Sequence, residues 1–301
     1  MTNIIVIIVL IVILVILLYF SKNNSEKFTN KSIIKLSGWY GRLGNNIKQI
    51  INGLHLMIEL KCDISIPPHD MFNFSNLPKY NNVKSINIDN NLFDQGNIIQ
   101  TYKNLNIDNI FNKNKKEVIT ILRSLFKIKY NDVYKYNNDD LHIHIRTGDI
   151  FRNQIISYYM QPPLDFYIKI IESRKFNKIY LLAEDNYNPT INKLIKKYPD
   201  IIWNKNNLID DIKIIMGCKN MVCGIGSFIP NILYFNEGIK DIWLPTRHDY
   251  ISGYIDVKEN IIDLSDYYNM LGRAVGFEGN KPEGVWMNTS DQLKIMIDYK
   301  L

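Results

Sequence analysis

Short apolar runs and amphipathic segments alternate along most of this chain. The apolar runs are typical of buried β-strands and lie at residues 33–37, 63–66, 141–146, 178–183 and 220–223. The segments between them carry apolar residues at three- and four-residue steps, as amphipathic helices do, at 45–60, 163–173, 189–197, 207–217 and 227–237. This order predicts an α/β architecture with parallel sheets. A polar break at residues 131–139 is the predicted domain boundary.

The composition excludes several classes of protein. Hydrophobic residues make up 46% of the 301 residues and charged residues 22%, which excludes a disordered chain. The three cysteines (Cys62, Cys218 and Cys223) match neither a disulfide framework nor a zinc pattern. The net charge is +6, but the lysines are scattered along the chain. We therefore expect a mildly basic solvated surface and no nucleic-acid partner.

Residues 4–20 form an unbroken apolar segment, which we interpret as an uncleaved transmembrane helix followed by a polar linker at 21–31. A cleaved signal peptide is the alternative, but the segment lacks a basic start and small residues at a cleavage site. The expected location is therefore a membrane, with a single span. The lysines after the span favour a cytosolic location for the rest of the chain. Glycosylation sequons starting at Asn23, Asn30, Asn73 and Asn288 would instead suit a lumenal location. The sequence therefore does not decide between the two sides of the membrane.

The first motif is the turn Gly41-Arg42-Leu43-Gly44-Asn45 between a predicted strand and a predicted helix. Glycines allow the backbone to approach a ligand closely, and the helix start offers free N–H groups to an anion or a sugar hydroxyl. The spacing fits neither a phosphate-binding P-loop nor a dinucleotide fingerprint. An ordinary strand–helix turn, with Asn45 as the N-cap of the helix, is the alternative interpretation.

The second motif is the strand end Leu141–Phe151. Strict alternation places His142, His144 and Arg146 on one face of the strand. Only seven of the 36 basic residues are arginines, so an arginine here favours a planar, permanently charged grip on phosphate at the carboxyl edge of the sheet. The alternatives are a buried ion pair between Arg146 and an aspartate, and a two-histidine metal site that lacks a third ligand.

The third motif, Cys223–Pro230, joins a predicted strand to a helix with Ser227 as the expected N-cap. A strand, a glycine turn and a helix start form a common phosphate site, although every α/β protein has several such turns. No Asp-Xaa-Asp sequence occurs in the chain. The usual carboxylate grip on a metal–nucleotide pair is therefore absent from the sequence.

Together and in this order, the motifs resemble those of the fucosyltransferase superfamily, which comprises α-1,2- and α-1,6-fucosyltransferases and protein O-fucosyltransferases. The α-1,2 group is the most similar. The turn Gly41–Asn45 matches the family's Gly-Gly/Arg-Leu/Phe-Gly-Asn turn, and His144–Asp149 matches its His-Xaa-Arg-Xaa-Gly-Asp strand end. Met216–Phe228 is similar to its cysteine-bearing strand and Ser-Phe turn. The likeness, which includes the segment Gln161–Tyr167, extends over about residues 33–245.

The resemblance implies a GT-B fold, in which two Rossmann-like α/β domains face each other across a cleft, here after an N-terminal transmembrane helix. Residues 32–135 would form the acceptor-side domain and residues 136–265 the nucleotide-sugar domain. The tail 266–301 would return to the N-terminal domain, as the last helix of such proteins often does. The implied activity is an inverting, metal-independent transfer of fucose from GDP-fucose to a glycan or glycoprotein acceptor, with no cofactor.

The resemblance also implies roles for individual residues. Arg146 would stabilise the charge on the leaving GDP, and Asn45 would reach the phosphates or the sugar across the cleft, so both are predicted catalytic residues. The predicted donor-binding residues are His144, Asp149, Gly41, Arg42, Gly44, Asp185, Ser227 and Phe228.

The chain departs from the family pattern at several positions. Thr147 stands where a second arginine is common, Asn46 where a glutamine is usual, and Ile229 begins a segment that is tryptophan-rich in the α-1,2 enzymes. These differences motivate two alternatives. One is a membrane-tethered carbohydrate- or nucleotide-binding protein that has kept the fold and lost catalysis, and the other is a transferase that uses a different nucleotide sugar.

Overall fold

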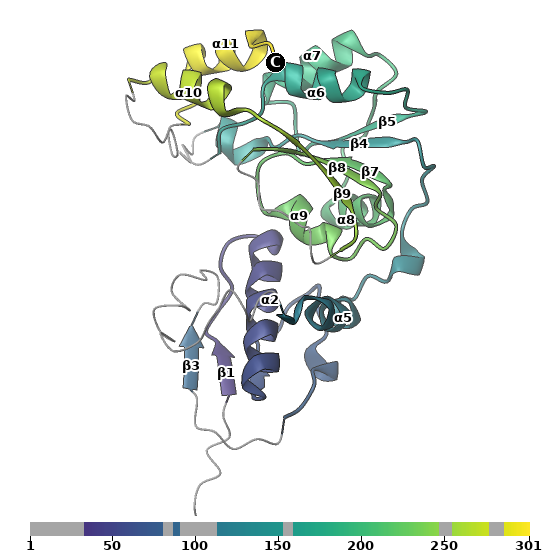
Figure 1. Cartoon of the computed structure of the whole chain (residues 1–301), viewed down its shortest axis with the longest axis vertical. Helices are drawn as coiled ribbons and strands as arrows, with labels where there is room; N and C mark the ends of the chain where they lie inside the picture. Colours follow the sequence, from purple (N-terminus) through teal and green to yellow (C-terminus); the bar gives the residue numbers. More distant parts are fainter. Residues whose placement is uncertain (1–32, 81–86, 91–112, 153–158, 247–254, 277–285) are drawn as a thin grey trace, which may run out of the picture.

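The computed structural model describes residues 33–80, 87–90, 113–152, 159–246, 255–276 and 286–301 (Figure 1). In this part the chain is a mixed α/β protein with eight α-helices, one sheet of three strands and one parallel sheet of six strands. The expected membrane anchor at 4–20 and the linker at 21–31 lie outside these ranges. Among the helices that are described, none has both the length and the apolar character needed to span a bilayer.

The smaller sheet contains the predicted strands near the start of the chain. Its strands β1 (Ile33–Leu36), β2 (Asp63–Ser65) and β3 (Asn87–Asn90) are parallel and run in the order β2-β1-β3. Helix α2 (Leu43–Leu60) connects β1 to β2 and buries a continuous apolar face that includes Ile47 and Leu54. Helix α5 (Lys115–Leu125) packs against α2.

The larger sheet contains β4 (Leu141–His144), β5 (Ile179–Leu182), β6 (Ile202–Trp203), β7 (Asn220–Val222), β8 (Asp241–Pro245) and β9 (Lys258–Ile262). The strands lie in the order β6-β5-β4-β7-β8-β9. If the six strands are numbered along the chain from β4, this order is 3-2-1-4-5-6. This is the order of a doubly wound nucleotide-binding sheet, and its direction of winding reverses between β4 and β7. Ligands of such sheets bind at the carboxyl ends of the strands that flank the reversal.

Helices cover both faces of the larger sheet. On one face lie α6 (Leu164–Glu172), α7 (Pro189–Lys197), α10 (Ser265–Arg273) and α11 (Ser290–Asp298). On the other face lie α8 (Leu208–Gly217) and α9 (Phe228–Leu233). The predicted alternation along β4 is confirmed, since Leu141, Ile143 and Ile145 all belong to the core on the α6 side. The core on the α8 side continues through α2 to β1, so the two sheets share one apolar core.

The described residues of the C-terminal tail, 266–276 and 286–301, pack on the larger sheet. Helix α11 contacts α6, α7 and α10, and all four lie together in Figure 1, on the side of the larger sheet away from α2. Tyr267, Trp286 and Met296 are fully buried in this layer. The chain end is held by Asp165, whose carboxylate accepts a hydrogen bond from the backbone N–H of Leu301 at 2.9 Å. The described tail residues thus lie on the larger sheet and not on the N-terminal domain that the resemblance suggested, because their apolar side chains complete the outer layer of that sheet.

Candidate functional site

A cavity of about 600 Å³ lies where the winding of the larger sheet reverses. Three segments line it: Gly41–Asn45 at the start of α2, His144–Thr147 at the end of β4, and Ile225–Phe228 between β7 and α9. These are the three motifs singled out in the sequence. The volume falls within the range typical of small-molecule sites, roughly 300–1,000 Å³.

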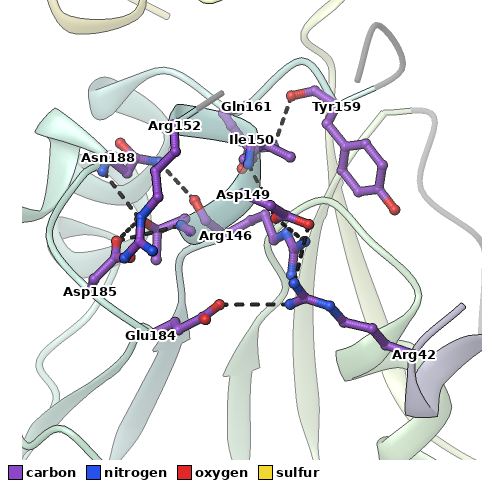
Figure 2. A network of polar contacts seen from close by, with 12 residues as sticks. Arg42, Arg146, Asp149, Ile150, Arg152, Tyr159, Gln161, Glu184, Asp185 and Asn188 are labelled. Atoms are coloured by element: carbon purple, nitrogen blue, oxygen red, sulfur yellow. Dashed lines mark hydrogen bonds and ion pairs between the residues drawn. The ribbon is translucent and has the colours of Figure 1, made fainter. Parts of the chain in front are cut away.

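Nearly all predicted site residues line this cavity, namely Gly41, Arg42, Gly44, Asn45, His144, Arg146, Asp149, Ser227 and Phe228. Their roles toward a ligand stay predictions. Asp185 is absent from the lining. Its carboxylate accepts hydrogen bonds from the hydroxyl of Thr147 and from the guanidinium of Arg152, the latter at 2.9 Å (Figure 2). Asp185 thus ties together the loops that follow β4 and β5.

The pKa of Asp185 reflects this environment. Burial acts to raise the pKa of the carboxyl group. The hydrogen bonds from Thr147, Tyr187 and Gly148, together with the charge of Arg152, outweigh burial and lower the pKa below its ordinary value. Asp185 is therefore held as a carboxylate for this network.

The starts of α2 and α9 are in direct contact. A Cβ atom on Gly44 would lie 2.7 Å from the carbonyl carbon and oxygen of Ser227, so only glycine fits at this position. The hydroxyl of Ser227 donates to Oδ1 of Asn45 at 2.5 Å. Neither side chain caps a helix as predicted: α2 begins after Arg42, and Ser227 occupies the N-cap position of α9 without a capping hydrogen bond. Both side chains instead join the two helix starts.

Buried amides position the loop that carries Arg42. Gln49 of α2 accepts a hydrogen bond from the N–H of Tyr40 at 2.9 Å and donates to the carbonyl of Gly38 at 3.0 Å. Asn46 donates to the carbonyl of Tyr40 at 3.1 Å. Asn46 and Gln49 are buried in a helix face that periodicity alone describes only as amphipathic. Their positioning role was not predicted from the sequence.

Two arginines and two carboxylates form an ion cluster at the cavity (Figure 2). Nη2 of Arg146 lies 2.5 Å from Oδ1 of Asp149, and Nη2 of Arg42 lies 3.2 Å from Oδ2 of the same carboxylate. Arg42 also faces Glu184 at 3.7 Å. The side chain of Arg146 is 18% exposed and that of Arg42 is 65% exposed. The ion pair considered as an alternative for Arg146 is thus present, and it lies inside the cavity.

Arg146 keeps hydrogen-bonding capacity beyond this pair. Its Nε–H is buried and has no hydrogen-bond partner in the part of the chain that the structure describes. An unsatisfied buried donor costs roughly 1–3 kcal/mol. An anionic ligand beside the guanidinium would supply the missing acceptor.

The lining includes further polar residues that the sequence analysis missed, among them Glu184, Lys205, Asn206 and Asp211. Asp211 lies in the first turn of α8 and accepts a hydrogen bond from the amide of Asn206 at 3.1 Å. Burial raises its pKa. Asp211 makes no ion pair with a described residue. In the sequence, only its place at the start of a helix after two asparagines could have drawn attention to it.

The two histidines of the second motif have different environments. His144 lines the cavity, and its ring lies 6.3 Å from that of Phe228. His142 is fully buried outside the cavity, with its ring 4.2 Å from that of Tyr136 and 4.7 Å from that of Tyr180. No group of three or more metal-ligating side chains occurs within the described ranges. His142 therefore belongs to an aromatic cluster.

We expect His142 to make the folding stability depend on pH. Burial lowers its pKa to about 4, whereas an unfolded histidine titrates near 6.5. Between these values the unfolded chain binds more protons, so stability falls as the pH decreases through this window. The loss between pH 7.5 and 5 should be about 2 kcal/mol from this group. Urea unfolding at both pH values measures it, and His142→Phe should lose this part of the dependence. An equal dependence in the variant would contradict the assignment.

Comparison with known proteins adds no relative: no protein-family model and no curated protein matches the chain.

Proposed function

We propose that this chain is a membrane-anchored glycosyltransferase of the GT-B type. It would be an inverting, metal-independent enzyme that transfers fucose from GDP-fucose to a glycan or protein acceptor. The observation that carries the proposal is that three motifs, separated by about a hundred and eighty residues from first to last, line one cavity at the reversal point of a doubly wound sheet. The order and the residues of these motifs are what resemble the fucosyltransferases.

The cations of the lining suit a diphosphate. Arg42, Arg146 and Lys205 supply positive charge, and the first turn of α2 adds backbone N–H groups at the same wall. In an inverting transfer, an acceptor oxygen forms a bond to the anomeric carbon while the bond from that carbon to the β-phosphate oxygen breaks. GDP leaves with the electron pair of that bond, and the acceptor hydroxyl releases its proton to solvent water. Arg146 would stabilise the charge that develops on the leaving phosphate.

Asp211 offers a means of selecting the base. Of the three carboxylates in the lining, Asp149 and Glu184 face arginines, whereas Asp211 has a neutral amide donor. Guanine presents two adjacent donors, N1–H and the N2 amino group, which a carboxylate can accept side by side. Uracil has no such pair of donors. A carboxylate at this wall therefore favours GDP over UDP.

Calorimetric titration of the full-length chain in EDTA tests the proposal. Wild type should bind GDP in preference to UDP, and also to inosine diphosphate, which lacks the N2 amino group. One paired contact of this kind discriminates by roughly 1–3 kcal/mol, or about 5- to 150-fold. In Asp211→Asn the preference for GDP over inosine diphosphate should fall to about threefold or less, because an amide offers only one acceptor oxygen.

Asp210→Asn is the matched control. Asp210 is the neighbouring carboxylate, but it accepts hydrogen bonds from Tyr134 and Asn207 and is not part of this cavity. This variant should keep the preference for GDP. If wild-type protein binds neither GDP nor GDP-fucose, the proposed function is wrong.

One observation favours the alternative of a binding protein without catalysis. Each carboxylate of the lining already has a partner: Asp149 and Glu184 face arginines, and Asp211 accepts from Asn206. Among the described residues, no carboxylate of the lining is therefore free to act as a general base for the acceptor. This alternative predicts the same titration results but neither transfer nor hydrolysis of GDP-fucose.

A further inference from the structure

The carboxylate of Asp149 lies where the two arginines of the cavity converge. Its Oδ1 accepts from Nη2 of Arg146 at 2.5 Å and from the backbone N–H of Ile150 at 3.1 Å, and its Oδ2 accepts from Arg42 at 3.2 Å. Figure 2 shows Arg42 and Arg146 reaching this carboxylate from different elements. The hydrogen bond to Ile150 ties the carboxylate to its own backbone turn. The carboxylate therefore keeps one hydrogen bond that does not depend on the arginines.

We propose that Asp149 is a built-in competitor for the anionic group of the ligand. Its carboxylate takes one Nη2 group of Arg42 and one of Arg146, donors that a phosphate in the cavity could also use. Binding then exchanges one anion for another: both arginines turn from the carboxylate to the phosphate, and the Nε–H of Arg146 gains an acceptor. This inference rests on the proposed function in one respect: it assumes that the ligand carries a phosphate.

The charge balance of the lining supports this assignment. Among the described residues, the cavity is lined by three cationic side chains (Arg42, Arg146 and Lys205) and by three carboxylates (Asp149, Glu184 and Asp211). The carboxylates thus offset part of the attraction that the cations offer to a diphosphate. Since Asp149 is the carboxylate bound directly to both arginines, it is the one whose charge most opposes a phosphate at the same donors.

The exchange also affects how the two sheets are held together. Arg42 lies between β1 and α2, and Asp149 lies in the turn after β4. Their ion pair therefore connects the loop of the smaller sheet to the larger sheet. A phosphate bound between Arg42 and Arg146 would take the place of the Asp149 carboxylate and would itself link the two sheets.

Titration with inorganic pyrophosphate tests the inference, because this probe has the diphosphate and no base or sugar. Asp149→Asn removes the negative charge and keeps an acceptor for the N–H of Ile150. We expect it to bind pyrophosphate about tenfold more tightly than wild type, since a like charge beside the ligand is lost. Asp241→Asn is the matched control: Asp241 pairs with Arg174 at 3.0 Å at the start of β8, outside the cavity, so affinity should not change.

Unchanged or weaker pyrophosphate binding in Asp149→Asn would overturn the inference and would mean that Asp149 aligns the arginines for the ligand. Asp149→Ser provides a second neutral variant should the amide not fold, and the same increase is expected. GDP titration separates this inference from the proposed function. Wild type that selects GDP, combined with no gain of affinity in either variant, would leave the function standing and reject the competition.

Discussion

Arg146→Lys should reduce the proposed fucosyl transfer from GDP-fucose by about 100- to 1,000-fold, the usual effect of removing a preorganised donor from a developing oxyanion. The substitution keeps the charge, so an effect of this size would come from geometry. The guanidinium of Arg146 uses one nitrogen on Asp149 and holds a second, buried N–H that has no partner among the described residues. A lysine ammonium is a point charge on a flexible stem and cannot offer two donors in a fixed plane.

The measurement is turnover under saturating donor, together with the affinity for GDP. Arg174→Lys is the matched control. The guanidinium of Arg174 donates hydrogen bonds to two side chains, Asp241 at 3.0 Å and Asn220 at 2.7 Å, but it lies outside the cavity. Its variant should keep turnover within about threefold of wild type while the protein is folded. Full activity in Arg146→Lys would reject the phosphate role of Arg146.

Gly44→Ala should destabilise the protein and abolish the ligand site, although the change improves helix propensity. Alanine is favoured over glycine inside a helix by about 1 kcal/mol, so local propensity predicts a more stable protein. The new Cβ would lie 2.7 Å from the carbonyl group of Ser227 and 2.8 Å from the backbone nitrogen of Phe228. Backbone atoms cannot rotate away, so the starts of α2 and α9 must separate. Overpacking of this kind costs roughly 1–3 kcal/mol.

Urea unfolding and GDP titration of Gly44→Ala measure the two effects. Gly38→Ala is the control, because a Cβ at Gly38 would have no atom within 4 Å. Gly38→Ala should unfold at the same urea concentration as wild type and bind GDP normally. If Gly44→Ala proves more stable than wild type and still binds GDP, the contact between the two helix starts does not hold the site together.

Much of the fold can be predicted from periodicity because each element is short and local. The strands predicted at 141–146 and 178–183 appear as β4 and β5, and the helix predicted at 189–197 appears as α7 with the same bounds. Other elements were missed. Strand β6 contains only two residues, α11 buries only Gln292 and Met296, and α5 was missed although it buries apolar side chains at helical spacing. Their formation depends on neighbours that are distant in the sequence.

The candidate site shows the same division between local and distant information. Arg146 and Asn45 could be singled out because glycines and a rare arginine mark strand ends and helix starts. Asp211 could not, since only the packing of α8 on the larger sheet brings it to the cavity. Asp185 was placed in the site because it follows a strand end. The structure instead bonds its carboxylate to Thr147 and Arg152.

The sequence by itself therefore determined the α/β class, the faces of β4 and the three turns that line the cavity, because periodicity and glycine turns act over a few residues. Only the tertiary structure decided which charges meet. Asp149 bridges Arg146, three residues away, and Arg42, more than a hundred residues away. Ion pairs and close backbone contacts such as Gly44 against Ser227 depend on distances in space. The strand order and the shared apolar core set those distances.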